Sequence, residues 1–146
     1  SLGYDFYKQF IKEENVHFVS GKTYDLLSHA HAALVTSGTA TLETALLGVP
    51  QVVVYKTSTL TYLAARMLLK IPYISLVNLL LGRKVVTELI QGEYNSANVV
   101  AELETLLTDD KTKKRISEGY SEIQKILGNQ SASKNAAKII TSLCSS

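Results

Sequence analysis

The sequence predicts an α/β fold in which a doubly wound parallel sheet carries helices on both faces. Short apolar segments alternate along the chain with segments of helical periodicity, and short links containing glycine, serine and proline join them. The short segments are apolar throughout instead of alternating with polar residues, which is typical of parallel strands covered on both faces. In open sheets of this kind, ligands bind at the carboxyl ends of the strands.

The first part of the chain predicts a helix, a strand and a second helix. An amphipathic pattern indicates a helix over residues 4–13. The apolar run 16–19 then predicts a strand, which the turn residues Ser20-Gly21 end. A short helix is expected over 23–30, so this part already contains one strand-turn-helix unit.

The same unit then repeats. Strand 32–35 leads through the turn Ser37-Gly38 into a helix over 39–47, and Gly48-Val49-Pro50 separates that helix from strand 51–55. Glycine and proline at such a link stop a helix, so these boundaries are well marked.

Two further elements complete the predicted sheet. The pattern indicates a helix over 59–69, and Pro72 precedes a last short strand over 73–76. Four strands alternating with helices are therefore expected.

The remainder of the chain predicts helices alone. Capping residues and apolar periodicity place three of them, over 95–107, 109–127 and 131–143. Gly128-Asn129-Gln130 forms a hinge before the last helix. We therefore expect a sheet domain over 1–128 and a tail helix over 129–146.

Composition excludes several classes of protein. With 46% hydrophobic and 19% charged residues among 146, the chain has enough apolar sequence to form a core. A net charge of +2 gives no electrostatic reason to expect a nucleic-acid partner. Cys144 has no second cysteine to pair with, no metal-ligand spacing is present, and no apolar stretch reaches the roughly 18 residues of a spanning helix. A cytoplasmic protein without a metal or cofactor is expected.

The first candidate site lies between strand 32–35 and the following helix. Gly38 allows close approach of a ligand to the backbone, and Ser37 and Thr39 add hydroxyl groups at a helix start, where phosphates bind. Glu43 falls about one turn into the helix, where its carboxylate could accept ribose hydroxyls. An ordinary helix start, with a capping hydroxyl and a solvated acid, explains these residues equally well.

The second candidate site follows strand 73–76. Asn78 is expected to end that strand, and Glu88 and Gln91 are three apart on an expected helix, where they would share a face. Their amide and carboxylate groups could bind sugar hydroxyls, and Arg83 could meet a phosphate. The alternative is a turn-forming Asn78 with surface charges, and we favour that alternative for Arg83 taken alone.

Two other features carry weaker hypotheses. His29 and His31 flank a helix-to-strand junction, but no third ligand accompanies them, which favours capping or surface roles over a metal site. The basic run 111–115 and the apolar stretch 60–69 are each most simply explained by a solvated face and a buried helix, with peripheral membrane contact as the alternative.

These segments together resemble one family of enzymes, the lipid A disaccharide synthases. The resemblance runs through five ordered motifs, namely Ala33 to Glu43, Gly48 to Tyr55, Leu60 to Tyr62, Pro72 to Leu80, and Gly82-Arg83 to Gln91. It covers residues 24–108 well and the segment from Ser131 more loosely.

The resemblance implies a fold and an activity. It implies the C-terminal half of an inverting GT-B glycosyltransferase, with two Rossmann-like domains, that uses no metal. Such an enzyme transfers 2,3-diacylglucosamine from its UDP derivative to 2,3-diacylglucosamine 1-phosphate. The products are lipid A disaccharide 1-phosphate and UDP, and the enzyme would work as a peripheral protein at the inner membrane.

The resemblance also implies roles for individual residues. Ser37, Gly38 and Thr39 would hold the diphosphate and Glu43 the ribose. The donor-sugar side of the cleft would be lined by Asn78, Arg83, Glu88 and Gln91. The general base would come from the amino-terminal domain.

The resemblance further implies that this chain is a truncated fragment. The first strand and glycine-rich turn of this half would precede residue 1, so the chain alone is expected to be inactive. An uncovered sheet edge would favour a homodimer, formed by edge pairing or by exchange of the tail helix, which in the full enzyme crosses to the other domain.

Two alternatives remain open at this point. Another UDP-sugar transferase or an epimerase would keep the serine-glycine-threonine turn and Glu43, but the motif from Asn78 to Gln91 favours the lipid A family. A non-catalytic α/β interaction module would need no nucleotide site at all. A dehydrogenase-type dinucleotide site is disfavoured, because no GxGxxG motif follows a first strand.

Overall fold

A computed structural model of the chain describes residues 4–11, 15–58, 62, 72–128 and 140–141. The chain divides into two compact units, residues 1–30 and residues 31–146.

The first unit contains two short helices, α1 (Tyr4–Lys8) and α2 (Thr23–Ser28). Its aromatic side chains form a small cluster, in which the rings of Tyr7 and Phe18 stack with centroids 5.1 Å apart. No side chain described in residues 5–30 is fully buried. The strand expected over 16–19 is wrong, because this segment has no regular secondary structure.

The second unit is built on a parallel sheet of three strands in the order β1-β2-β3. The strands are β1 (Ala33–Thr36), β2 (Gln51–Tyr55) and β3 (Thr87–Ile90). Val53 lies opposite Val35 on one side and Glu88 on the other. The central strand β2 is buried from Gln51 to Val54, as expected for a strand covered on both faces.

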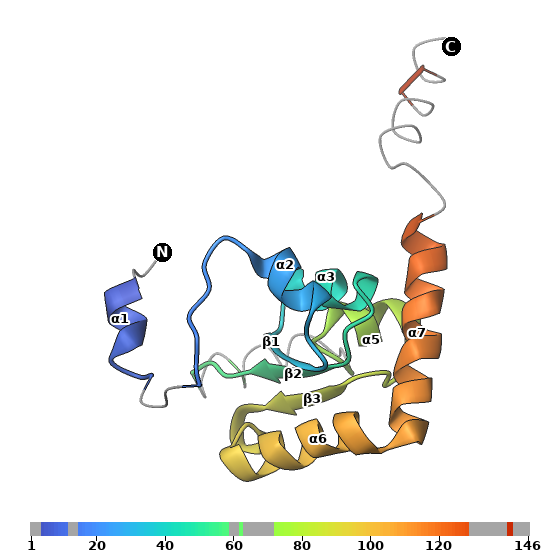
Figure 1. Ribbon diagram of the computed structural model, residues 1–146. Coiled ribbons are helices and arrows are strands. Elements are labelled where there is room, and N and C mark those ends of the chain that lie inside the picture. Colours follow the sequence, from blue (N-terminus) through green and yellow to red (C-terminus); the bar gives the residue numbers. More distant parts are fainter. Residues whose placement is uncertain (1–3, 12–14, 59–61, 63–71, 129–139, 142–146) are drawn as a thin grey trace. The chain divides into compact units, whose positions relative to one another are not determined.

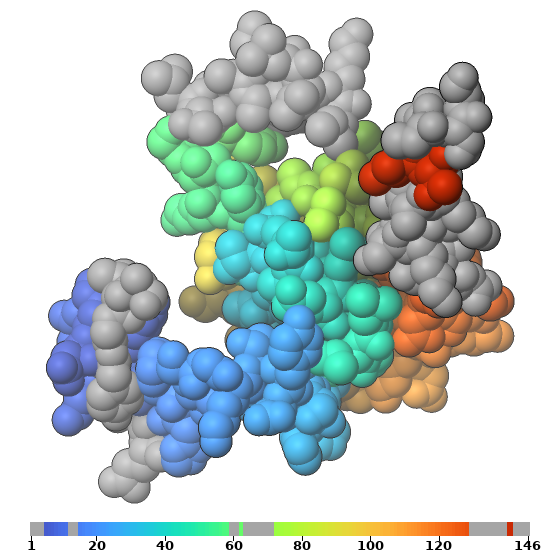
Figure 2. Space-filling model, turned by 90° about the horizontal axis from the view of Figure 1, so that it is seen from above, coloured from blue at the N-terminus to red at the C-terminus, as the bar shows by residue number. Residues whose placement is uncertain are grey.

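Helices cover both faces of this sheet (Figure 1). On one face lie α3 (Ala40–Leu46) and α5 (Leu76–Leu81), and on the other lies α6 (Ser96–Thr108). The long helix α7 (Asp110–Gly128) packs against α3, α5 and α6. Figure 2 looks down on the first of these faces, where the teal atoms of α3 lie beside the orange atoms of α7. The predicted fold class, an α/β sheet with helices on both faces, is confirmed.

The hydrophobic core lies on both sides of β2. It is formed by valines of β2 and of the loop before β3, together with apolar residues of α5, α6 and α7. These core residues include Val52, Val53, Val77, Val85, Val86, Leu106, Ile116 and Ile123. Helices α6 and α7 begin where the sequence predicts, since Asn95 caps Asn98 and Asp109 caps Thr112.

The expected order of elements between residues 73 and 91 is wrong. The segment predicted as a strand leads into α5, because the Ser75 hydroxyl accepts the backbone N–H of Asn78 at 3.2 Å and Gly82, at φ +63°, ends the helix. The segment predicted as a helix forms β3, where Thr87 and Leu89 are buried and Glu88 and Ile90 are half-buried. That alternation has the period of a strand.

Two predicted helices lie almost entirely outside the described residues. The helix expected over 59–69 lies outside the described residues except for Tyr62, and the tail helix expected over 131–143 does so except for Ile140-Thr141. In the part of the chain that is described, no helix is long and apolar enough to cross a membrane.

Candidate functional site

The parallel strands bring three loops to one edge of the sheet. β1 ends at Thr36, β2 at Tyr55 and β3 at Ile90. Each strand runs in the same direction, so the segments that follow them leave the sheet side by side. The segments at this carboxyl edge are 37–39, 56–58 and 91–93.

The turn between β1 and α3 combines a fixed serine with an open glycine. The Ser37 N–H donates to the Val54 carbonyl at 3.0 Å, and its hydroxyl donates to the Ile74 carbonyl at 2.8 Å. Gly38 has φ +154°, and a Cβ built there would meet no atom within 4 Å. The backbone at Gly38 is therefore accessible to a ligand, whereas the hydroxyl hydrogen of Ser37 is already donated within the protein.

Thr39 and Glu43 lie at the start of α3, and no side-chain hydrogen bond or ion pair joins either of them to another described residue. Thr39 is exposed and makes no side-chain capping hydrogen bond. Glu43 is half-buried in the first turn of the helix, and within the described residues no ion pair engages its carboxylate. In contrast, the Thr41 hydroxyl donates to the Gly38 carbonyl at 2.7 Å. Thr39 and Glu43 are therefore the groups of this turn that remain available to a ligand.

Asn78 is a buried structural junction between α5 and β3. Its Oδ1 accepts the N–H groups of Val85 at 2.7 Å and Val86 at 3.0 Å. Its Nδ2 donates to the Val86 carbonyl at 2.9 Å and to Glu88 Oε1 at 2.8 Å. The amide, which has two donors and two acceptor positions, is thus fully used by the protein. The expectation that Asn78 ends a strand is wrong, because it lies inside α5.

Glu88 links β3 to the segment before α5. Its Oε2 accepts the Ile74 N–H at 2.9 Å, and its Oε1 accepts the Ser75 N–H at 3.0 Å. The Ile74 carbonyl in turn receives the Ser37 hydroxyl. A chain of hydrogen bonds therefore connects Glu88 to the turn at Gly38.

Gln91 joins the ends of β2 and β3 through its side chain. Its Oε1 accepts the Thr57 N–H at 2.9 Å, and its Nε2 donates to the Thr57 carbonyl at 3.1 Å. Gln91 itself has φ +53°, a left-handed conformation that is uncommon for a residue with a Cβ. The expected helix shared by Glu88 and Gln91 is wrong, since the former lies in β3 and the latter begins the short 3-10 helix η1 (Gln91–Glu93).

Arg83 lies toward the opposite edge of the sheet. It precedes β3, and its Nη1 and Nη2 donate to the two carboxylate oxygens of Glu122 in α7 at 3.0 and 2.6 Å. Hydrogen bonding to Glu122 raises the pKa of Arg83, and the same bond lowers the pKa of Glu122. The arrows of the strands in Figure 1 point away from α7. The structure therefore does not bring Arg83 to the edge that holds Gly38 and Gln91.

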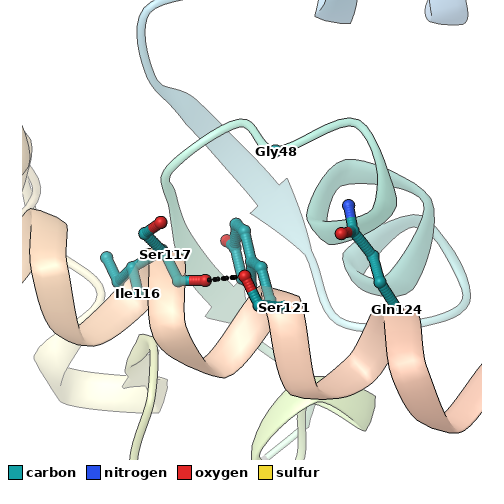
Figure 3. Close-up of a pocket in the computed structure, with 6 residues that line it drawn as sticks. Gly48, Ile116, Ser117, Ser121 and Gln124 are labelled. Atoms are coloured by element: carbon teal, nitrogen blue, oxygen red, sulfur yellow. Dashed lines mark hydrogen bonds between the residues drawn. The ribbon is translucent and has the colours of Figure 1, made fainter.

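A surface hollow also lies on the α7 side of the sheet. It has a volume of about 260 Å³ and is lined by Gly48, Ile116, Ser117, Tyr120, Ser121 and Gln124 (Figure 3). At its base the Tyr120 hydroxyl donates to the Val49 carbonyl at 3.1 Å and accepts from Gln51 Nε2 at 3.0 Å. Burial raises the pKa of Tyr120. Because Gly48 precedes β2, this hollow is separate from the loops at the carboxyl edge.

The structure adds three residues that the sequence analysis did not single out. Thr57, Ile74 and Ser75 hold the loops around Gly38 through their backbone groups. Ser75 could have been found from its position three residues before Asn78, which is the spacing of a helix N-cap. Within the described residues, no group of three or more His, Cys, Asp or Glu side chains is arranged to hold a metal ion.

Comparison with known proteins shows the family. A family model described as lipid-A-disaccharide synthetase matches residues 4–142, which is nearly the whole chain.

The chain belongs to this family.

Sequence comparison with individual members of the lipid-A-disaccharide synthetase family supports the same assignment. The chain is 44% identical to the lipid-A-disaccharide synthase of Syntrophus aciditrophicus over 128 residues, which is 88% of the chain and 33% of that protein. It is 41% identical to the Acidobacterium capsulatum enzyme over 73% of the chain and 27% of that protein. For the Solibacter usitatus enzyme, the identity is 33% over 96% of the chain and 37% of that protein. The chain thus spans about a third of the length of these relatives.

Proposed function

We propose that this chain forms the donor-binding half of a lipid A disaccharide synthase. The enzyme would transfer 2,3-diacylglucosamine from its UDP derivative to 2,3-diacylglucosamine 1-phosphate, giving lipid A disaccharide 1-phosphate and UDP. Membership of the family supports this reaction class. The observation that carries the proposal is the open turn at Gly38 at the carboxyl edge of the sheet, with Thr39 and Glu43 beside it, neither of which bonds to another side chain among the described residues.

In the proposed site, different residues bind the diphosphate and the ribose of the nucleotide sugar. The diphosphate lies against the backbone at Gly38 with the Thr39 hydroxyl beside it, and Ser37 contributes by holding the turn through its hydrogen bond to the Ile74 carbonyl. Glu43, one turn further along α3, accepts hydrogen bonds from the ribose hydroxyls. Glu88 and Asn78 support this site through Ile74 and Ser75, and any direct contact they make with the donor sugar would require them to exchange a protein partner.

The proposed reaction is a displacement at the anomeric carbon of the donor. The 6-hydroxyl of the acceptor attacks C1, the bond from C1 to the diphosphate oxygen breaks, and the configuration at C1 inverts. The electron pair of that bond leaves with UDP, and hydrogen-bond donors that bind the diphosphate stabilise its developing charge. The general base that takes the proton of the acceptor hydroxyl is proposed to lie in the amino-terminal part of the full-length enzyme.

The arrangement of the whole enzyme is likewise a proposal. We propose a sheet domain over 1–128 and a tail helix over 129–146 that crosses to the other domain. Peripheral contact with the cytoplasmic face of the inner membrane would give access to the two lipid substrates. The isolated chain is expected to be inactive and to self-associate through a sheet edge or the tail helix.

Binding of UDP by the chain tests this proposal. Isothermal titration calorimetry should show saturable binding of UDP, and ADP should not reproduce it. Glu43→Ala should abolish the binding, because it removes the carboxylate that holds the ribose. Glu102→Ala is the matched control, since it removes a half-buried carboxylate from α6 on the other face of the sheet. Equal binding of ADP and UDP, or full binding by Glu43→Ala, would contradict the assignment.

A further inference from the structure

The cations of the second unit are distributed unevenly around the sheet. Arg83 and Lys84 precede β3, and the basic run 111–115 lies in the first turns of α7. Arg83 is also committed to a two-bond ion pair with Glu122. Of the basic residues described between 31 and 128, Lys56 is the one that directly follows a strand.

Lys56 lies at the middle of the carboxyl edge. It is one residue beyond Tyr55, which pairs with Ile90, so continuing the register places it level with Gln91. On the other side, Thr36 pairs with Val54, so the same continuation places Lys56 level with Gly38. Neighbouring strands are about 4.8 Å apart, and Lys56 therefore stands between the two loops of the proposed site.

The side chain of Lys56 is available to a ligand. It is exposed, and no ion pair or side-chain hydrogen bond involves it in the part of the chain that the structure describes. A lysine ammonium is a compact charge with three donors, which suits a phosphate group.

Hydrogen bonds from a side chain fix the backbone next to Lys56. Both backbone groups of Thr57 are bonded to the side chain of Gln91, at 2.9 and 3.1 Å. Gln91, whose side chain makes these bonds, has a left-handed backbone conformation at φ +53°. A strained backbone conformation persists where the surrounding contacts hold it, and such residues cluster at ligand sites. The two hydrogen bonds fix the chain one residue after the lysine.

We propose that Lys56 is the cation that binds the diphosphate of the nucleotide sugar, and that Gln91 is the positioning residue that sets its backbone. This inference rests on the proposed function, and it assigns to Lys56 the phosphate contact that the sequence suggested for Arg83. Gln91 then acts through Thr57 instead of through a direct contact with the sugar.

Comparison of UDP with uridine tests the role of Lys56. Lys56→Met removes the charge and keeps most of the side-chain length. It should weaken UDP binding about tenfold, as expected for loss of a charge-assisted hydrogen bond. It should leave the affinity for uridine, measured by ligand-observed NMR, unchanged, because uridine has no phosphate. Gln91→Ala should give a smaller loss that is likewise confined to UDP, and Lys84→Met, the matched control, should bind both ligands as the unsubstituted chain does.

The possible results separate this inference from the proposed function. If the unsubstituted chain binds no UDP, the proposed function fails and the role of Lys56 fails with it. If the unsubstituted chain binds UDP and Lys56→Met binds it equally well, or loses uridine to the same degree, the role of Lys56 alone is overturned. A loss of UDP affinity in Arg83→Met but not in Lys56→Met would return the phosphate contact to Arg83. Raising the salt concentration should weaken UDP binding to the unsubstituted chain more than to Lys56→Met, since salt screens the charge.

Discussion

At the scale of single residues, the candidate site depends on polar side chains that bond to the backbone. Asn78, Glu88 and Gln91 are polar residues that sequence patterns assign to a ligand, yet apart from the bond between Asn78 and Glu88 their described partners are main-chain groups of neighbouring loops. Such bonds fix loops that have no regular structure of their own. Glu88 and Gln91 therefore hold the loops around Gly38, at Ile74, Ser75 and Thr57, and Asn78 fixes the loop before β3.

Replacement of Asn78 should lower stability strongly. Asn78→Ala leaves the N–H groups of Val85 and Val86 buried without an acceptor, and the loss should reduce the free energy of unfolding by roughly 2–4 kcal/mol. Urea unfolding followed by circular dichroism measures the change. Asn98→Ala is the matched control, because its exposed amide makes one side-chain bond, to the Glu93 carbonyl, and it should lose less than about 1 kcal/mol. Equal urea midpoints for the two variants would rule out the structural role of Asn78.

Tyr120 should make stability depend on pH in the alkaline range. Burial raises its pKa above the ordinary value of about 10, so the folded state keeps the proton while the unfolded chain loses it. The stabilisation is full below pH 10 and decreases as the pH rises further, by up to roughly 1.4 kcal/mol per pH unit. Unfolding free energies measured between pH 9 and pH 11 should show this decline, and Tyr120→Phe should remove much of it. Tyr24→Phe, which alters an exposed ring, should keep the original slope, and an equally steep decline in Tyr120→Phe would refute the assignment.

At the scale of elements, the contact between α7 and the loop before β3 requires a glycine. A Cβ placed on Gly119 would lie 2.5 Å from Val85 Cγ1, and Val85 is itself fully buried. The close approach lets α7 cover the end of α5 and the loop before β3. Helix propensity alone would favour alanine at this position by about 1 kcal/mol.

Gly119→Ala should therefore destabilise the protein in spite of the better helix former. We expect a loss of about 1–3 kcal/mol in the free energy of unfolding, because the added methyl group overpacks the core. Thermal and urea unfolding measure it. Combining Gly119→Ala with Val85→Ala should cost less than the sum of the two single changes, since the smaller side chain makes room. Additive losses would contradict the contact, and Glu118→Ala on the neighbouring exposed position should have little effect.

The elements that the sequence predicts well are those with unambiguous boundary signals. The turn Ser37-Gly38 and the stop at Gly48 bracket α3, and capping residues mark the starts of α6 and α7. The secondary structure predicted for residues 73–91 was wrong because short apolar runs do not distinguish a buried helix from a strand. The partners of Asn78 and Gln91 lie across the fold, and no local pattern encodes them. The turn at Gly38 could be predicted as a candidate site, whereas the loops that hold it could not.

At the scale of the whole molecule, burial differs sharply between the two units. In the second unit, β2 is buried from Gln51 to Val54 and hydrogen-bonded on both sides. In the first unit, the described side chains from residue 5 onward are exposed or half-buried. Local stability follows buried contacts and protected hydrogen bonds.

Hydrogen exchange should follow this difference. Amides of β2 should exchange slowest, through opening of the whole second unit, and amides of 15–22 should exchange within the shortest labelling times. Mass spectrometry of peptides from a deuterium-labelling time course measures both. α6 provides an internal reference, because it is a regular helix of the same unit that is exposed on one side. Protection of 15–22 equal to that of β2 would show that the first unit is as stable as the sheet.

The hydrogen bonds of Asn78 have a consequence for how this family can change during evolution. One amide bonds to Val85, Val86 and Glu88 together, so the ten-residue separation of Asn78 and Glu88 is fixed by geometry. An insertion or deletion between them would detach β3 from α5 and shift every later side chain in the strand to the opposite face. Homologous sequences should therefore keep the number of residues between Asn78 and Glu88 constant.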